Sequence, residues 1–322
     1  MRTICTLLLL IALFSNHAPA RAQVRSVPVS LTFTVTDESG HALKTLRKED
    51  VRLVEEGVGR EVTGFELHSG VRFSLAMLID TSVSQARILP AEKIAARAFV
   101  ELLVKPGTDL VSVSSFEAEA KQEQGLTDDP ALLRQAIERI NFEPPPGYEP
   151  ASITGILTAK PPPPNDAPMP GSTDIWNTLW EACAGLENSP TGARRAIILL
   201  TDGNDTAERR KMSEAVERAI RKGVAVYSIG IGDEEYGGTD KNTLRKLSER
   251  TGGRAFFPKT DLQLQAAFTE IGEALRSQYV VAYESANLKQ SRPFRKVRIE
   301  IVNPELRRRH LHLAQPEGYF TN

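Results

Sequence analysis

The sequence predicts a doubly wound α/β fold, in which helices cover both faces of a mainly parallel sheet, together with a small β unit. Three apolar runs have the length and composition of buried parallel strands, and they are residues 73–79, 195–201 and 224–231. Each run is followed by a stretch in which apolar residues recur with helical spacing, and this alternation is typical of parallel sheets. The two ends of the chain alternate apolar and polar residues instead, which predicts that both contribute strands to the β unit.

Composition places the chain among globular proteins that are long enough to bury a large core. It has 322 residues, of which 41% are hydrophobic and 25% are charged, and these fractions are ordinary for a folded protein. The formal net charge is −1, so there is no electrostatic reason to expect nucleic acid as a partner. No run after the N-terminal segment reaches the length of a membrane span, so we expect none in the mature chain.

Residues 1–22 are predicted to be a signal peptide. Arg2 gives a positive start, and residues 7–14 form an apolar stretch that is too short to span a bilayer as a mature helix. Ala20-Arg21-Ala22 then matches a small-x-small cleavage pattern. We predict cleavage after Ala22 and export to the periplasm or the medium; the alternative is a buried N-terminal helix.

Cleavage at this point would remove Cys5 and leave Cys183 as the single cysteine. A lone cysteine cannot form an internal disulfide. Cys183 lies in residues 176–186, where the apolar spacing is helical, so we expect a buried thiol.

Residues 23–70 are predicted to form the N-terminal part of the β unit. Three segments have the composition of short strands, namely residues 27–35, 51–55 and 61–67. Gly57 and Gly59 lie between the last two, which predicts that these two strands pair as a hairpin. A unit of this size is near the lower limit for independent stability, so we expect it to pack on the main domain.

Residues 71–280 are predicted to form the main α/β domain. Besides the three apolar runs, a strand is expected at residues 109–116 and a short edge strand at 254–257. Pro130 marks the first turn of one helix, with Asp128 or Asp129 as its cap. The other predicted helices are residues 89–104, 174–185, 206–222, 239–250 and 261–277.

A proline-rich insertion at residues 143–171 interrupts this alternation. It holds ten of the chain's 20 prolines, and proline has no amide hydrogen to donate to a helix or a strand ladder. Polyproline II structure or disorder is therefore expected. The insertion is either a docking arm for an aromatic-lined partner or a variable surface loop.

Residues 281–322 are predicted to be a C-terminal β segment. Strand-like alternation begins just before this boundary and recurs after it, at residues 278–284, 296–302 and 310–313. We expect these strands to join the N-terminal β unit.

Oxygen-bearing side chains occur in three segments of the main domain. They are Asp80, Ser82 and Ser84 after the first apolar run, Thr173 in a Gly-Ser-Thr loop, and Asp202 after the second apolar run. In an open α/β sheet, ligands bind at the carboxyl ends of the strands. Hard oxygen ligands with few charges favour a Mg²⁺-like cation over a soft metal.

These three segments together resemble the metal-ion-dependent adhesion site of the von Willebrand factor type A domain family. The family pattern is Asp-x-Ser-x-Ser, then a threonine, then an aspartate at the end of a later strand, and all five positions occur here in order. The resemblance covers residues 71–280, although the usual Gly-Gly-Thr is Gly-Ser-Thr in this chain. The signal peptide and the N-terminal β unit are similar to those of bacterial secreted proteins related to this family.

The resemblance implies a role for each of the five residues. Ser82 and Ser84 would bind the metal directly, Asp80 and Asp202 directly or through water, and Thr173 in either way. The metal would be Mg²⁺, with Mn²⁺ or Ca²⁺ as alternatives. A partner protein with an exposed Asp or Glu would complete the coordination, so the implied function is adhesion or protein–protein interaction rather than catalysis.

Other interpretations of the same residues remain open. Without metal, Asp80 and Asp202 would be polar turn residues and Thr173 a helix N-cap. A metal-independent scaffold of the cell envelope is one alternative function. Mg²⁺-dependent phosphoryl transfer with Asp80 as nucleophile is another, but such enzymes usually carry a second carboxylate at the place that Ser82 occupies. No phosphate-binding loop or nucleophile-elbow motif is present either, so we expect no enzymatic activity.

Overall fold

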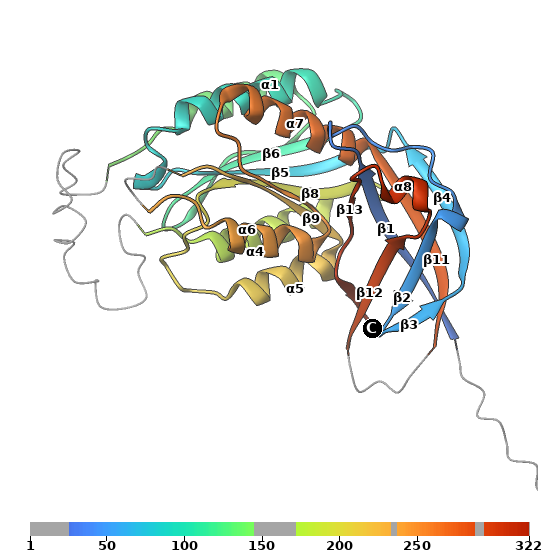
Figure 1. Ribbon diagram of the computed structural model, residues 1–322. Helices are drawn as coiled ribbons and strands as arrows, with labels where there is room; N and C mark the ends of the chain where they lie inside the picture. Colours follow the sequence, from blue (N-terminus) through green and yellow to red (C-terminus); the bar gives the residue numbers. More distant parts are fainter. Residues whose placement is uncertain (1–25, 145–171, 233–236, 287–292, 322) are drawn as a thin grey trace, which may run out of the picture.

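The computed structural model describes residues 26–144, 172–232, 237–286 and 293–321. These residues form an α/β part and a β sandwich that lie side by side (Figure 1). The predicted signal peptide and nearly all of the predicted proline-rich insertion lie outside the described residues. No helix in the described ranges is long and apolar enough to cross a lipid bilayer.

The α/β part is built on a six-stranded sheet with the order β10-β9-β8-β5-β6-β7. All neighbouring strands pair in parallel except β7, which runs antiparallel to β6 at the edge. This confirms the predicted doubly wound, mainly parallel fold. The strands are β5 (Phe73–Asp80), β6 (Leu110–Phe116), β7 (Ala120–Thr127), β8 (Arg194–Thr201), β9 (Val224–Gly230) and β10 (Ala255–Phe256).

Helices cover both faces of this sheet, as Figure 1 shows. Alternate residues of β5 point to opposite faces: Leu75 and Met77 join the core under α1, α2 and α7, while Ala76 and Leu78 join the core over α4, α5 and α6. The helices are α1 (Leu89–Leu103), α2 (Pro130–Arg139), α4 (Ile175–Gly185), α5 (Met212–Lys222), α6 (Lys241–Thr251) and α7 (Asp261–Arg276).

The strand order reverses between β5 and β8. From β5 the chain moves to β6 on one side, and it later returns to place β8 on the other side. The two helix layers diverge at such a point, which leaves a crevice at the carboxyl ends of the two strands. Asp80 and Thr201 are the last residues of β5 and β8.

The β sandwich consists of two four-stranded sheets with the orders β13-β1-β11-β4 and β14-β12-β2-β3. Phe33 and Tyr279 from one sheet share a buried core with Leu53 and Val297 from the other. Its strands are β1 (Ser26–Thr36), β2 (Val51–Glu55), β3 (Val58–Arg60), β4 (Val62–Ser69), β11 (Ser277–Ala286), β12 (Phe294–Ile301), β13 (His312–Ala314) and β14 (Gly318–Phe320). A short helix, α8 (Pro304–Arg307), follows β12.

Both ends of the chain therefore build the sandwich, which confirms this part of the predicted fold. β11 is the central link, because it pairs with β1 on one side and with β4 on the other. It also continues directly from α7, which ends at Arg276, one residue before β11 begins. The sandwich and the α/β part are thus joined through a continuous helix-to-strand segment.

Several sequence predictions are wrong in detail. The predicted hairpin instead joins β2 to β3, with Glu56 and Gly57 both at positive φ in the turn, and β4 belongs to the other sheet. α5 begins at Met212 rather than at residue 206, because residues 202–211 form an extended loop. Strands β3, β7 and β14 were not predicted; they are short or polar and lie at sheet edges.

Candidate metal centre

Asp80 is the best-defined residue of the candidate site. As the last residue of β5, it is completely buried. Its Oδ1 accepts a hydrogen bond of 2.9 Å from the backbone N–H of Ser82, and its Oδ2 accepts one of 2.5 Å from the hydroxyl of Thr201 at the end of β8. The first bond shapes the turn that follows β5, and the second connects the two strand ends.

The surroundings of Asp80 oppose its negative charge. Burial raises the pKa of Asp80 to about 7, with a further contribution from the charge of Asp202. The hydrogen bonds from Thr201 and Ser82 act in the other direction but do not offset these two effects. A cation placed beside Asp80 would therefore stabilise its charged form.

Ser82 and Ser84 lie in the turn after β5, where residues 83–85 form one turn of 3-10 helix. Their hydroxyl oxygens are 3.2 Å apart and hydrogen-bonded to each other. Ser82 is buried and Ser84 is half-buried. The two hydroxyls thus lie together at the same strand end as Asp80.

Asp202 follows β8 directly and is also buried. Its Oδ1 accepts a hydrogen bond of 2.9 Å from the backbone N–H of Asn204, which closes a turn of the kind that aspartate favours. Gly203 adopts φ +89°, and a Cβ at this position would lie only 2.9 Å from Leu244 Cγ. Glycine is therefore required for the chain to turn here and keep Asp202 at the strand end.

Thr173 precedes α4 and is held against the loop that follows Asp202. Its backbone N–H donates to Thr206 Oγ1 at 2.8 Å, and its carbonyl accepts from the N–H groups of Thr206 and Ala207 at 2.9 and 3.1 Å. The N-cap of α4 is Asp174 rather than Thr173. The Thr173 hydroxyl forms no hydrogen bond with other residues in the described ranges.

The structure thus places the predicted site residues in two groups. Asp80, Ser82 and Ser84 lie together after β5, Asp202 follows Thr201 at the adjacent end of β8, and Thr173 is attached to the loop after Asp202. Within the described residues, no three side chains of His, Cys, Asp or Glu converge as a metal-binding group. A cation at this site would therefore depend on hydroxyl ligands beside two carboxylates, a donor set that suits a hard divalent ion.

Several residues that support this site were not predicted from the sequence. Thr201 connects the two strand ends, and Asp205 Oδ1 accepts a hydrogen bond of 2.7 Å from the backbone N–H of Ile175 at the start of α4. Glu92 is buried on α1 near the charges of Asp80 and Asp202. The sequence could have indicated the burial of Glu92, because its position follows the helical spacing of one apolar face, with Leu89, Ala96 and Phe99.

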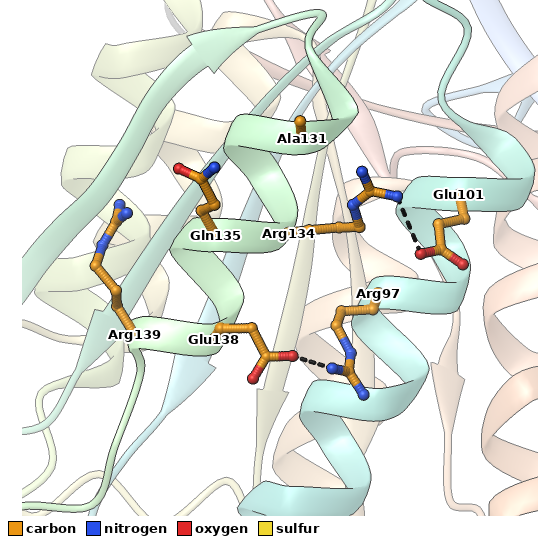
Figure 2. Close-up of a pocket in the computed structure, with 7 residues that line it drawn as sticks. All are labelled: Arg97, Glu101, Ala131, Arg134, Gln135, Glu138 and Arg139. Carbon is orange, nitrogen blue, oxygen red and sulfur yellow. Dashed lines mark hydrogen bonds and ion pairs between the residues drawn. The ribbon is translucent and has the colours of Figure 1, made fainter.

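A groove lies elsewhere, between α1 and α2, with a volume of about 530 Å³ (Figure 2). It is lined by charged side chains that are largely paired, because Arg97 binds Glu138 and Arg134 binds Glu101. Arg139 donates to the carbonyl of Glu123. This groove therefore offers compensated surface charge rather than a convergent binding site.

Comparison with known proteins supports the classification of the fold. The family model described as the von Willebrand factor type A domain matches residues 168–270, which include Thr173 and Asp202. Residues 168–270 therefore match a von Willebrand factor type A domain. Among curated proteins, no match was found.

Solved structures resemble the chain with low sequence identity. The conserved hypothetical protein BatB from Bacteroides thetaiotaomicron is 19% identical over 64% of this chain and 98% of its own, with a TM-score of 0.45. A von Willebrand factor type A protein from Catenulispora acidiphila is 15% identical over 73% of this chain and 68% of its own, with a TM-score of 0.49. Proximal thread matrix protein 1 from the mussel byssus, solved with a zinc-occupied adhesion motif, is 16% identical over 69% of this chain and 50% of its own, with a TM-score of 0.48.

Proposed function

We propose that this chain is a binding protein that holds a divalent cation at Asp80, Ser82, Ser84, Thr173 and Asp202 and uses it to capture an acidic group of a partner protein. The observation that carries this proposal is the arrangement at the ends of β5 and β8. There, two buried carboxylates lie beside a pair of hydroxyl groups 3.2 Å apart.

The chemistry of this donor set favours Mg²⁺, with Mn²⁺ or Ca²⁺ as alternatives. Two carboxylates carry a charge of −2, which equals but does not exceed the +2 charge of a divalent ion. The hydroxyl ligands are neutral and add no further negative charge. A cation bound in this way keeps an affinity for a further negative ligand. An Asp or Glu side chain of a partner is the simplest ligand of this kind.

We propose no catalytic role for the site. In Asp80 the two carboxylate oxygens already accept hydrogen bonds from Ser82 and Thr201, and Ser82 stands where a phosphoryl-transfer enzyme would place its second carboxylate. Purified protein should not hydrolyse generic phosphate esters. Mg²⁺-dependent hydrolysis that is lost in Asp80→Asn would contradict this.

The predicted signal peptide supports a location outside the cytoplasm, in the periplasm or the medium. The proposed partner is then a protein of the cell envelope or the extracellular space. The predicted proline-rich insertion precedes Thr173 in the chain, so it is a candidate docking arm for the same partner.

A metal-independent scaffold is the second candidate function. One observation favours it: Asp80 and Asp202 both accept hydrogen bonds from within the chain, from Thr201 and Asn204 among others. The two carboxylates are therefore partly satisfied without a cation. In this case the sandwich or the proline-rich insertion would carry the binding.

Capture experiments with the chain from Gln23 onward distinguish the two functions. The immobilised protein is exposed to envelope and medium fractions in Mg²⁺, then eluted with EDTA, in parallel with Asp80→Ala and the exposed control Asp261→Ala. We expect a partner that is retained by the wild type and the control, released by EDTA and absent from Asp80→Ala. Capture that resists EDTA and survives Asp80→Ala would favour the scaffold.

A further inference from the structure

Glu92 in the first turn of α1 is a buried acid without a partner. Its side chain is completely buried, and neither carboxylate oxygen has a hydrogen-bond partner among the residues that the structure describes. No lysine or arginine in the described part of the chain forms an ion pair with it. An acid in such a place is costly unless something supplies a proton or a positive charge, so its presence calls for a specific explanation.

The first turn of α1 lies over the carboxyl ends of the central strands. The turn that leads from β5 into α1 is held at this edge of the sheet, because Gln85 Nε2 donates to the carbonyl of Ile231, which follows β9. Burial raises the pKa of Glu92 well above its ordinary value, and the charges of Asp80 and Asp202 raise it further. Glu92 is therefore buried close enough to the two carboxylates of the candidate centre for their charges to act on it.

This region contains hydrogen-bond acceptors that lack donors. In addition to both oxygens of Glu92, the Oε1 of Gln85 is buried without a partner, while its Nε2 donates to the carbonyl of Ile231. A hydrated divalent cation would supply what is missing, because it brings positive charge and its bound waters donate hydrogen bonds. A buried water alone would supply donors but no charge.

We infer that Glu92 is an outer carboxylate of the candidate metal centre, which accepts hydrogen bonds from metal-bound water and strengthens cation binding. It acts through water rather than as a direct ligand, because no three acidic side chains of the described residues converge on one point. This inference rests on the proposed function. It predicts that Glu92 controls how tightly the centre holds its metal.

Mn²⁺ binding, measured from the electron paramagnetic resonance signal of free Mn²⁺, tests this inference on the chain from Gln23 onward. We expect Glu92→Gln to weaken Mn²⁺ binding by about 10- to 100-fold, the usual effect of removing an outer-shell partner. Glu92→Asp keeps the charge and should bind between Glu92→Gln and the wild type. Glu101→Gln, an exposed acid on the same helix, is the matched control and should bind as the wild type does.

Thermal melting without metal separates this role from a structural one. We expect Glu92→Gln to melt no lower than the wild type, because it removes a buried acid that has no partner. Wild-type affinity in Glu92→Gln, equal losses in Glu92→Asp and Glu92→Gln, or failure of Glu92→Gln to fold would each overturn the inference while the proposed function stands. Absence of Mn²⁺ binding by the wild type would overturn both.

Discussion

Asp80 accepts hydrogen bonds from Ser82 and Thr201, yet burial and the charge of Asp202 raise its pKa to about 7. Its geometry is thus fixed by donors that only partly offset the cost of its charge. Glu55 in the sandwich shows the opposite balance. Burial alone would raise the pKa of Glu55, but hydrogen bonds from Ser285, Tyr319 and Tyr283 and the charge of Arg295 lower it below its ordinary value of 4.5. The contrast indicates that the charge of Glu55 is compensated within the fold and stabilises it, whereas Asp80 lacks a counter-charge.

We predict that Glu55→Gln lowers the free energy of unfolding by about 3 kcal/mol, because Arg60 and Arg295 would lose their buried carboxylate. Denaturant titration of the variant checks this. The control is Glu300→Gln, whose ion pairs with Arg52 and Arg298 lie at the surface, and its loss should be much smaller than that of Glu55→Gln. Equal losses in the two variants would contradict a buried charged network.

The same group gives the wild type an acid-sensitive component of stability. The pKa of Glu55 is lower in the folded chain than its ordinary value of 4.5, so the stabilisation is fully present above about pH 4.5 and is lost as the pH falls below it. Unfolding free energies measured between neutral and acid pH should fall less steeply in Glu55→Gln than in the wild type. Parallel pH profiles would show that another group is responsible.

Cys183 is buried in α4, as the sequence predicted, and burial raises the pKa of its thiol to about 12. A thiol with this pKa is almost entirely protonated at neutral pH and reacts poorly with alkylating reagents. We predict negligible labelling by iodoacetamide in the native protein and full labelling in concentrated guanidinium chloride. Rapid native labelling would contradict the packing of α4 on the sheet.

At the scale of elements, the candidate site depends on two loops that hold each other. The loop after β8 supplies Asp205 to the start of α4 and Thr206 to the backbone of Thr173. Arg209 from the same loop binds Asp174, the N-cap of α4. These contacts hold Thr173 against the loop that follows β8.

Thr206→Val is predicted to loosen the attachment of Thr173. It removes the acceptor of the 2.8 Å hydrogen bond from Thr173 and leaves a partly buried N–H group unsatisfied, which costs about 1–3 kcal/mol. We expect weaker Mg²⁺ binding by calorimetry and earlier unfolding by denaturant titration. Thr269→Val on the exposed side of α7 should leave both measurements close to the wild type.

The elements that the sequence predicted well are those with a strong periodic signal. β5 is buried along its whole length and reads as a continuous apolar run, so its end at Asp80 was predictable. β7 is largely polar because it lies at the sheet edge, and it has no comparable signal. The prediction that this helix begins at residue 206 was wrong. Residues 202–211 make long-range contacts with α4 instead, and local helix propensity does not reveal such contacts.

The candidate site was predictable only in part for the same reason. Its five residues follow from the motif positions, whereas Thr206 contacts Thr173 only in the folded chain, and Glu92 comes near the charges of Asp80 and Asp202 only there. The helical spacing of apolar residues around Glu92 predicts that its side chain is buried. A single acid on an apolar helix face does not reveal which side chains of other elements surround it. Only the folded chain places the turn that leads into α1 at the carboxyl ends of the central strands.

At the scale of the whole molecule, the sandwich and the α/β part share structural elements. β11 continues from α7 and pairs with both β1 and β4. Arg276 at the end of α7 also binds Asp109 with two hydrogen bonds of 2.8 and 2.5 Å, so this junction is fixed to the strand layer. We therefore propose that the two parts fold as one cooperative unit.

This proposal predicts coincident unfolding transitions in the two parts. Trp176 and Trp180 are the chain's two tryptophans and both lie in α4, so their fluorescence reports on the α/β part. Tyr279 and Tyr283 are buried in the sandwich core. Their near-ultraviolet circular dichroism therefore reports on the sandwich. Guanidinium titrations should give the same midpoint with both probes, and two separated midpoints would show independent domains.

Calorimetric titration of Mg²⁺ and Mn²⁺ into the wild type and Asp80→Ala shows whether a divalent cation binds at the ends of β5 and β8. We expect saturable binding of one cation to the wild type and none to Asp80→Ala, with both proteins folded by circular dichroism. Equal heats of binding for the two proteins, or no binding to the wild type, would contradict it.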